Sequence, residues 1–193
     1  MQARHEIIAL YAVMTSCSYS ASEASQNSVE ACEIALHYAQ HFTEKVENFE
    51  PFEERRLAVI SRREGLVPTQ EDLDLYTAQN PPVYDPGEFE LVRIAINADD
   101  VSVLDECENV RKWAARNDVL LDENKIDELT REEKWSIVLL NLTMPAVSKN
   151  SSKAIIYVSE YAGGLAGVSG SMTYEKGPDG QWRIIEEIVL GVS

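Results

Sequence analysis

The chain has 193 residues, of which 45% are hydrophobic and 26% charged, and this composition is typical of one globular domain with an apolar core. Its 33 Asp and Glu residues against 17 Lys and Arg residues give a formal net charge of −16 at pH 7. Because nucleic acids and anionic membrane surfaces are bound through clustered Lys and Arg, this charge argues against both as partners. An unknown protein or a small molecule remains as the partner, and no apolar run is long enough for a membrane span.

Residues 1–25 have two interpretations. An apolar run at 7–14 lies between a charged start and a small, polar stretch, which is the order of a secretory signal. Residues 14–17 also resemble a degenerate bacterial lipoprotein box, in which Cys17 would be the lipidated residue. The alternative is a first helix packed on the core, because apolar residues recur at helical spacing at Ile7, Leu10, Tyr11 and Met14. An exported, periplasmic or lipid-anchored protein and a cytoplasmic one therefore both remain open, and residues 26–193 are predicted to form a single α+β domain.

The strongest helical pattern covers residues 28–48, with Ser28 as its expected N-cap. Its apolar residues recur every three or four positions and define one stripe: Cys32, Leu36, Ala39, Phe42, Val46 and Phe49. Pro51 predicts the start of a second helix over 52–64. A capping-box pattern that begins at Thr69 predicts a third, short helix.

The middle of the chain alternates between short predicted elements. These are a loop at 80–88, a helix at 88–98, a short strand at 101–104, helices at 108–117 and 126–135, and a strand at 136–142. Trp113 and Ile126 are expected to face the core, because they fall on the apolar sides of their helices. Pro145 bends or ends the strand that precedes it.

From residue 153 onward the chain predicts an antiparallel meander. Strand patterns at 153–161, 171–176 and 182–190 are separated by a Gly-Gly break and by a Gly-Pro-Asp-Gly turn at 177–180. Alternation along the first of these strands assigns one face to Ala154, Ile156 and Val158 and the other to Ile155, Tyr157 and Tyr161. One face of the last strand is expected to hold Trp182, Ile184, Ile188, Leu190 and Val192, interrupted by Glu186. The expected fold is α+β, with N-terminal helices packed on a C-terminal antiparallel sheet of three to five strands.

The motifs that carry a resemblance are Lys-Ala-Ile-Ile-Tyr-Val at 153–158, Gly-Gly-Leu-Ala-Gly at 163–167 and Lys-Gly-Pro-Asp-Gly-Gln-Trp at 176–182. This pattern resembles the C-terminal part of uncharacterised, often exported bacterial α+β proteins. It is also loosely similar to the terminal meander of cystatin-like folds of the nuclear-transport-factor type. The resemblance covers residues 139–193 and implies an architecture alone, because it brings no catalytic motif. The long helical front half departs from a simple cone-shaped fold of that kind.

Three residues of metal-binding type lie in one row of the 28–48 helix. Glu33, His37 and His41 follow one another at intervals of four, which places their side chains on one face, as a helical metal site requires. The pattern is not His-Glu-x-x-His, and the row borders the apolar stripe, where polar residues usually meet water. These three are the candidate ligands, but no metal is predicted. No cofactor is predicted either, because the glycine-rich segment 163–170 lacks the Gly-Lys-Ser/Thr ending of a phosphate loop.

Two neighbouring carboxylates, Glu186 and Glu187, are the candidate catalytic groups. One of them is expected to point toward the face of Trp182 and Ile188, where desolvation would raise its pKa and suit it to general acid catalysis. The alternative is a carboxylate that reaches solvent or pairs with Arg183.

Aromatic side chains of the predicted sheet are candidates for lining a ligand cleft: Tyr157, Tyr161, Tyr174 and Trp182. Aromatic residues also fit strands through propensity alone. Cys32 and Cys107 are expected to be buried thiols, although an oxidising compartment would permit a bridge between them. No histidine follows residue 41, which excludes a serine triad in the order of the α/β-hydrolases.

The small catalytic inventory favours a non-enzymatic binding or interaction protein, exported or not. One alternative is a small-molecule enzyme that uses Glu186 or Glu187 as an acid/base on the C-terminal sheet. The other is a membrane-tethered lipoprotein, which requires cleavage before Cys17.

Overall fold

The computed structural model describes residues 11–47, 55–63, 65–79, 84, 86–98, 100–131, 135–163 and 166–192, and for 11–26, 86 and 166 it describes the backbone alone. The helices are α1 (Tyr11–Glu47), α2 (Gln70–Ala78), α3 (Pro86–Asn97), α4 (Val103–Glu106), α5 (Glu108–Arg116) and α6 (Glu123–Thr130). The strands are β1 (Arg56–Ile60), β2 (Ile137–Leu142), β3 (Ala146–Val147), β4 (Lys153–Gly163), β5 (Ala166–Lys176) and β6 (Trp182–Val192). Helices that mostly precede the C-terminal strands confirm the α+β fold.

The strands form one mixed sheet in the order β1-β2-β4-β5-β6, with β3 paired to β4. The C-terminal meander is antiparallel as predicted, whereas β1 pairs with β2 in parallel. The predicted helix over 52–64 is therefore wrong where the structure describes it. Its residues Ala58, Val59 and Ile60 are all buried, and a short apolar run covered on both faces is typical of a parallel strand.

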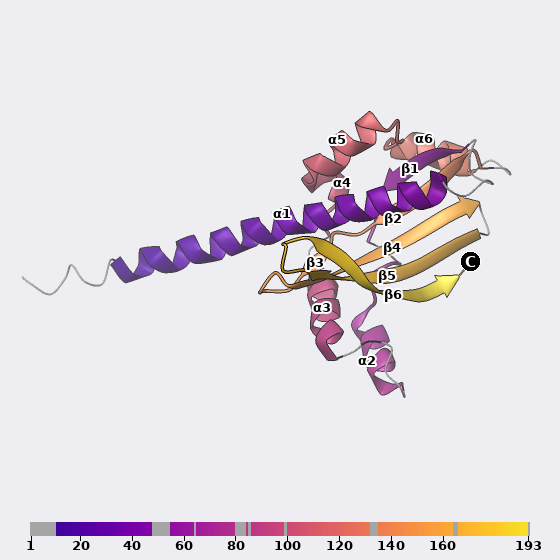
Figure 1. Cartoon of the computed structure of the whole chain (residues 1–193). Coiled ribbons are helices and arrows are strands. Elements are labelled where there is room, and N and C mark those ends of the chain that lie inside the picture. The colour runs from indigo at the N-terminus through magenta and orange to yellow at the C-terminus, as the bar shows by residue number, and fades with distance from the viewer. Residues whose placement is uncertain are drawn as a thin grey trace, which may run out of the picture.

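Helices cover both faces of the sheet (Figure 1). Because consecutive side chains of a strand point to opposite faces, they enter different cores. On the first face, α1, α4 and α5 pack on Val59, Leu140, Ile156 and Tyr174. On the second face, α3 packs on Ile155 and Tyr157 and is itself contacted by α2, while α6 packs separately on β1 and β2. The predicted alternation along β4 is thereby confirmed.

Several helix predictions are confirmed, with changes at their ends. The long first helix is present, but it begins at Tyr11 instead of Ser28, and α2 has the predicted capping box, in which Thr69 accepts the Asp72 N–H. Trp113 and Ile126 are buried as expected. The strand predicted at 101–104 is wrong, because the Ser102 side chain accepts the Leu104 N–H and caps the short helix α4. Trp135 lies outside α6.

The expected common face of β6 is also wrong. Relative to β5, β6 carries an extra residue at Ile185 and another at Leu190, so its register shifts twice. Each such bulge moves the following side chains to the other face. Trp182 therefore lies in the first-face core, and Ile188 packs on the second.

The expectation of two free thiols is wrong as well. Cys32 of α1 and Cys107, the residue between α4 and α5, form a disulfide with an S–S distance of 2.07 Å. Cysteine spacing in the sequence does not reveal pairing, since the two residues are brought together by the packing of α5 against α1.

The interpretation of residues 1–25 stays a prediction. Figure 1 shows the first half of α1 extending beyond the sheet, but residues 1–10 and the side chains of Tyr11, Met14 and Cys17 lie outside what the structure describes. Among the described residues, no helix combines the length and the apolar character that crossing a membrane requires.

Candidate functional site

A groove of about 670 Å³ opens on the second face of the sheet, beside α6. Its floor is formed by Leu139 of β2 and Tyr161 of β4, which are direct cross-strand neighbours. Ile126 of α6 and Trp135 add apolar wall. Ligand pockets in proteins usually measure roughly 300–1,000 Å³ and combine an apolar lining with a few polar groups. The size and lining of this groove match that description.

Asn141 is the best-placed polar group in the groove. It is 7% exposed and lies in β2 between apolar neighbours, and its Oδ1 accepts the Arg62 N–H at 2.8 Å. That bond orients the amide, and within the described residues its Nδ2 donor has no hydrogen-bond partner. The Asn141 Nδ2 is not one of the buried side-chain atoms that lack a partner, so this donor reaches water in the groove, where a ligand acceptor can take the place of that water.

Two arginines form the rim of the groove, and both are held in place. Arg62 pairs with Glu123 at 2.8 Å and with Asp127 of α6 at 3.5 Å. Arg63 donates to the carbonyls of Ala95, Ile96 and Ala98 at the C-terminal end of α3, where helix carbonyls lack intrahelical donors. The rim is therefore braced between α6 and α3, and its charges are largely compensated.

Of the residues predicted to line a ligand cleft, Tyr161 alone lies in this groove. Tyr174 lies on the first face, where its hydroxyl is 3.3 Å from His37 Nδ1. Burial lowers the pKa of His37 below its ordinary value, His41 lowers it further and Glu44 opposes the change. These effects favour the neutral ring, whose tautomer decides whether Nδ1 or the Tyr174 hydroxyl is the donor.

A second polar contact joins α1 to the sheet next to His37. The Tyr38 hydroxyl donates to Glu160 Oε1 at 2.7 Å, and Lys45 pairs with Glu160 Oε2 at 2.9 Å. Burial and the Glu160 carboxylate raise the pKa of Tyr38 far above its ordinary value, so its proton stays in place. This cluster fixes α1 to the sheet.

Tyr157 is enclosed on the second face. Burial raises its pKa well above the ordinary tyrosine value, and so do Tyr84 and Tyr76 beside it. The hydroxyls of Tyr84, Tyr157 and Ser171 are all buried without a well-formed hydrogen bond among the described residues. Tyr157 and Ser171 are cross-strand neighbours, and Tyr84 lies beside Tyr157, so these groups form one buried cluster of hydroxyls.

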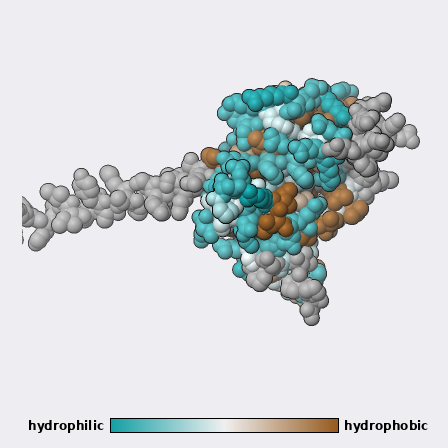
Figure 2. All heavy atoms as spheres, viewed as in Figure 1, coloured by the Kyte–Doolittle hydropathy of each residue, from teal (hydrophilic) through white to brown (hydrophobic). Residues whose placement is uncertain are grey.

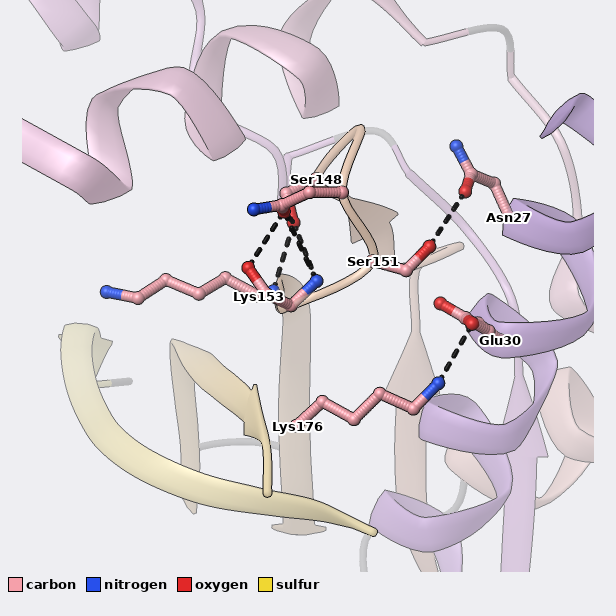
Figure 3. A network of polar contacts seen from close by, with 8 residues as sticks. Asn27, Glu30, Ser148, Ser151, Lys153 and Lys176 are labelled. Carbon is pink, nitrogen blue, oxygen red and sulfur yellow. Dashed lines mark hydrogen bonds and ion pairs between the residues drawn. The ribbon is translucent and has the colours of Figure 1, made fainter. Parts of the chain in front are cut away.

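Trp182 is buried in the first-face core next to Lys176, which belongs to a polar network between α1 and the sheet (Figure 3). Lys176 Nζ pairs with Glu30 Oε1 of α1 at 2.9 Å and lies 5.3 Å from the centre of the Trp182 ring. Nearby, Ser151 donates to Asn27 at 3.4 Å, and Ser148 Oγ accepts the Lys153 N–H at 3.0 Å. These contacts join α1 to the sheet and to the loop before β4.

The remaining candidates are exposed. Glu186 and Glu187 both face solvent, so the desolvation expected for one of them is not present, and their catalytic function stays a prediction. Glu33 and His41 are also exposed, and His37 reaches solvent with one side of its ring packed against Tyr174. In the part of the chain that the structure describes, no three residues of His, Cys, Asp or Glu type gather as they would around a metal ion. The side chain of Cys17 lies outside the described residues.

Sequence reasoning missed most of the groove, including Asn141, Arg62 and Trp135. One signal was available for Asn141: it is a polar residue within the apolar run Ile137–Leu142. A buried polar residue in such a run needs a partner and is therefore informative. No local pattern linked it to Arg62, which is distant in the sequence.

Comparisons with protein-family models, with curated proteins and with solved structures found no match. The fold and the groove therefore carry the functional argument.

Proposed function

We propose that this protein is a non-enzymatic binding protein that works in an oxidising compartment and takes a small organic ligand in the groove beside α6. The single observation that carries the proposal is the Asn141 amide, which the bond from the Arg62 N–H orients and whose Nδ2 donor opens into the groove beside its apolar floor. The ligand is expected to have a flat or branched apolar body and one acceptor, such as a carbonyl, carboxylate or sulfonate oxygen.

The surroundings of Asn141 support binding over catalysis. The apolar body would lie between Leu139, Ile126 and Trp135, and the acceptor would reach Asn141 Nδ2. The two rim arginines are engaged, Arg62 in ion pairs with Glu123 and Asp127 and Arg63 in bonds to helix carbonyls, so they hold the walls in place and are not poised for proton transfer.

The disulfide supports the proposed compartment. Bridges between cysteines persist in secreted and periplasmic proteins and are rare in the reducing cytosol. The Cys32–Cys107 bridge therefore supports export, which the sequence left open.

The groove is tested with 8-anilinonaphthalene-1-sulfonate, which has an aromatic body and sulfonate acceptors. Thr130 lines the groove from α6, so a Thr130→Trp substitution fills it. Glu128→Trp places the same side chain on an exposed position of the same helix and serves as the matched control. We expect Thr130→Trp to weaken dye binding at least tenfold and Glu128→Trp to leave it nearly unchanged.

The contact with Asn141 is tested by NMR on the same samples. Dye binding should shift the side-chain amide signals of Asn141 in the wild type and not in Thr130→Trp. Equal dye affinity of the two proteins, or dye binding that leaves the Asn141 amide unaffected, would overturn the proposal.

A further inference from the structure

The two edge strands of the sheet, β1 and β6, differ in whether a described segment covers their outer side. At β1, the Val59 N–H donates to the Leu120 carbonyl at 2.9 Å, and the Leu120 N–H donates to the Leu57 carbonyl at 2.9 Å, so a neighbouring segment already covers this edge. At the other end, β6 has β5 as its neighbour, and no strand in the described ranges pairs with its outer side. A long strand with an uncovered backbone is a template for one more strand.

Exposed apolar side chains gather on this edge and its neighbour. Among the described residues, seven large apolar side chains are exposed, and four of them lie on β5 and β6: Val168, Ile185, Val189 and Val192. Val168 and Val192 are cross-strand neighbours, and Val189 lies opposite Gly170, so these valines share the first face. In Figure 2, hydrophobic atoms in brown are exposed where Figure 1 places β6. Contiguous exposed apolar surface of this kind usually marks an interaction site.

Two kinds of strand can pair with such an edge: the β6 strand of a second copy of this chain, or an extended segment of another protein. The charge of the chain distinguishes between them. Pairing with a second copy would bring together two chains of net charge −16, each with the exposed carboxylate of Glu187 on the pairing strand. Like charges oppose that contact, and charged residues and bulges are the means by which edge strands avoid self-pairing. For a basic segment, the same carboxylate becomes an attraction.

We infer that β6 is a docking strand for an extended, basic segment of another protein. The segment adds to the sheet through main-chain hydrogen bonds along the outer side of β6. Its apolar side chains lie beside Val189 and Val192, and a Lys or Arg lies beside Glu187. This inference is independent of the groove, which is lined by α6, β2 and β4.

The probe is a blocked heptapeptide of alternating Lys and Val, titrated against the full chain by fluorescence anisotropy. Two matched peptides accompany it: one with Glu in place of Lys, and one with N-methyl groups on alternate backbone nitrogens. Because methylation removes the N–H donors and keeps the charge, it separates strand addition from nonspecific attraction to an acidic protein. We expect the Lys–Val peptide to bind and both matched peptides to bind at least tenfold more weakly.

The protein variants locate the site. Val189→Lys places a repelling charge on an exposed position of β6, so it should weaken binding at least tenfold without altering the core. Glu187→Gln should weaken binding by a smaller factor, whereas Glu128→Gln, at an exposed acid of α6, should have no effect. Thr130→Trp should bind the peptide as the wild type does, so failure of this inference and failure of the groove proposal are distinguishable.

Several results would overturn the inference. They are no binding of the Lys–Val peptide, equal binding of the methylated peptide, or unchanged binding by Val189→Lys. A wild-type dimer in sedimentation that Val189→Lys dissociates would also overturn it, because a second copy would then be the occupant of β6.

Discussion

The two faces of the sheet are covered in different ways. One long helix, α1, crosses the first face and is fixed by a disulfide, by the Glu30–Lys176 pair and by the Tyr38–Glu160 bond. The second face is covered by separate helices, α3 and α6, and the groove lies between α6 and the residues braced against α3. On the first face α1 has several attachments and packs together with α4 and α5, whereas on the second face α3 and α6 are separate helices with the groove beside α6. The second face is thus the one on which this groove reaches the sheet.

The largest effect on stability is expected when the disulfide that fixes α1 on the first face is removed. Replacing both cysteines, Cys32→Ser with Cys107→Ser, should lower the free energy of unfolding by about 2–4 kcal/mol, because the bridge closes a loop across 75 positions of the chain. Urea unfolding of the oxidised wild type and of the variant measures the difference. Dye binding in the groove should persist below the unfolding transition, since the groove does not use α1.

Cys17→Ser is the control for this prediction, because Cys17 is not part of the bridge. It should unfold as the wild type does. A wild type whose unfolding midpoint is unchanged by reducing agent would contradict the idea that the bridge holds the first face closed.

A smaller effect is expected from the buried ion pair at the entry of α1. Lys176→Met should cost about 2 kcal/mol, because it leaves the Glu30 carboxylate, with its side chain 6% exposed, without a cation. Lys112→Met breaks an exposed pair within one helix, and because solvent screens such a pair, the variant should unfold almost as the wild type does. Thermal or urea unfolding of both variants gives the comparison.

The pair itself is tested by a second substitution. Adding Glu30→Gln to Lys176→Met should recover part of the lost stability, since the unpaired charge is then removed. If the double variant is less stable than Lys176→Met, the carboxylate does not depend on Lys176, and the ion pair is not what fixes α1 at this end.

The smallest expected effect concerns pH and the contact of His37 with Tyr174. The pKa of His37 is lowered in the folded protein from its ordinary value of 6.5, so between the two values the unfolded chain binds more protons. Stability therefore falls as pH decreases below about 6.5. In His37→Asn this part of the pH dependence should vanish. In His41→Asn it should shrink, because burial, the larger cause of the shift, remains.

Urea unfolding at about pH 7.5 and about pH 5.5 measures this effect as a difference between wild type and variant. Taking differences removes the contribution of the acidic groups, which all three proteins share. Parallel pH profiles for wild type and His37→Asn would mean that the ring titrates alike in both states and that its contact with Tyr174 does not strengthen the first face.

Local signals in the sequence were sufficient for part of this structure. The capping box at Thr69 and the apolar stripe of α1 predicted their helices, because both depend on residues a few positions apart. The strand β1 was missed, because four apolar residues in a row suit a buried strand and a helix equally and only its parallel partner β2 decides between them. The faces of β6 were misassigned because a bulge has no reliable signature in the sequence.

The groove was less predictable than the fold. Its key pair, Arg62 and Asn141, is joined by a hydrogen bond between segments that meet only after β1 and β2 align. The catalytic candidates Glu186 and Glu187 were chosen from assumed burial, and both are exposed on an edge strand. Their negative charge is more relevant to the kind of segment that docks along β6 than to proton transfer.

The parallel pairing of β1 with β2 also has a consequence for how the molecule assembles. During synthesis β1 emerges well before β2, with α2 to α6 between them, and contacts across such separations form slowly because a long loop must first close. The Cys32–Cys107 bridge encloses β1 and leaves β2 outside. Early oxidation would confine β1 close to its final position before its neighbour arrives, and we expect the oxidised chain to refold faster than the reduced one.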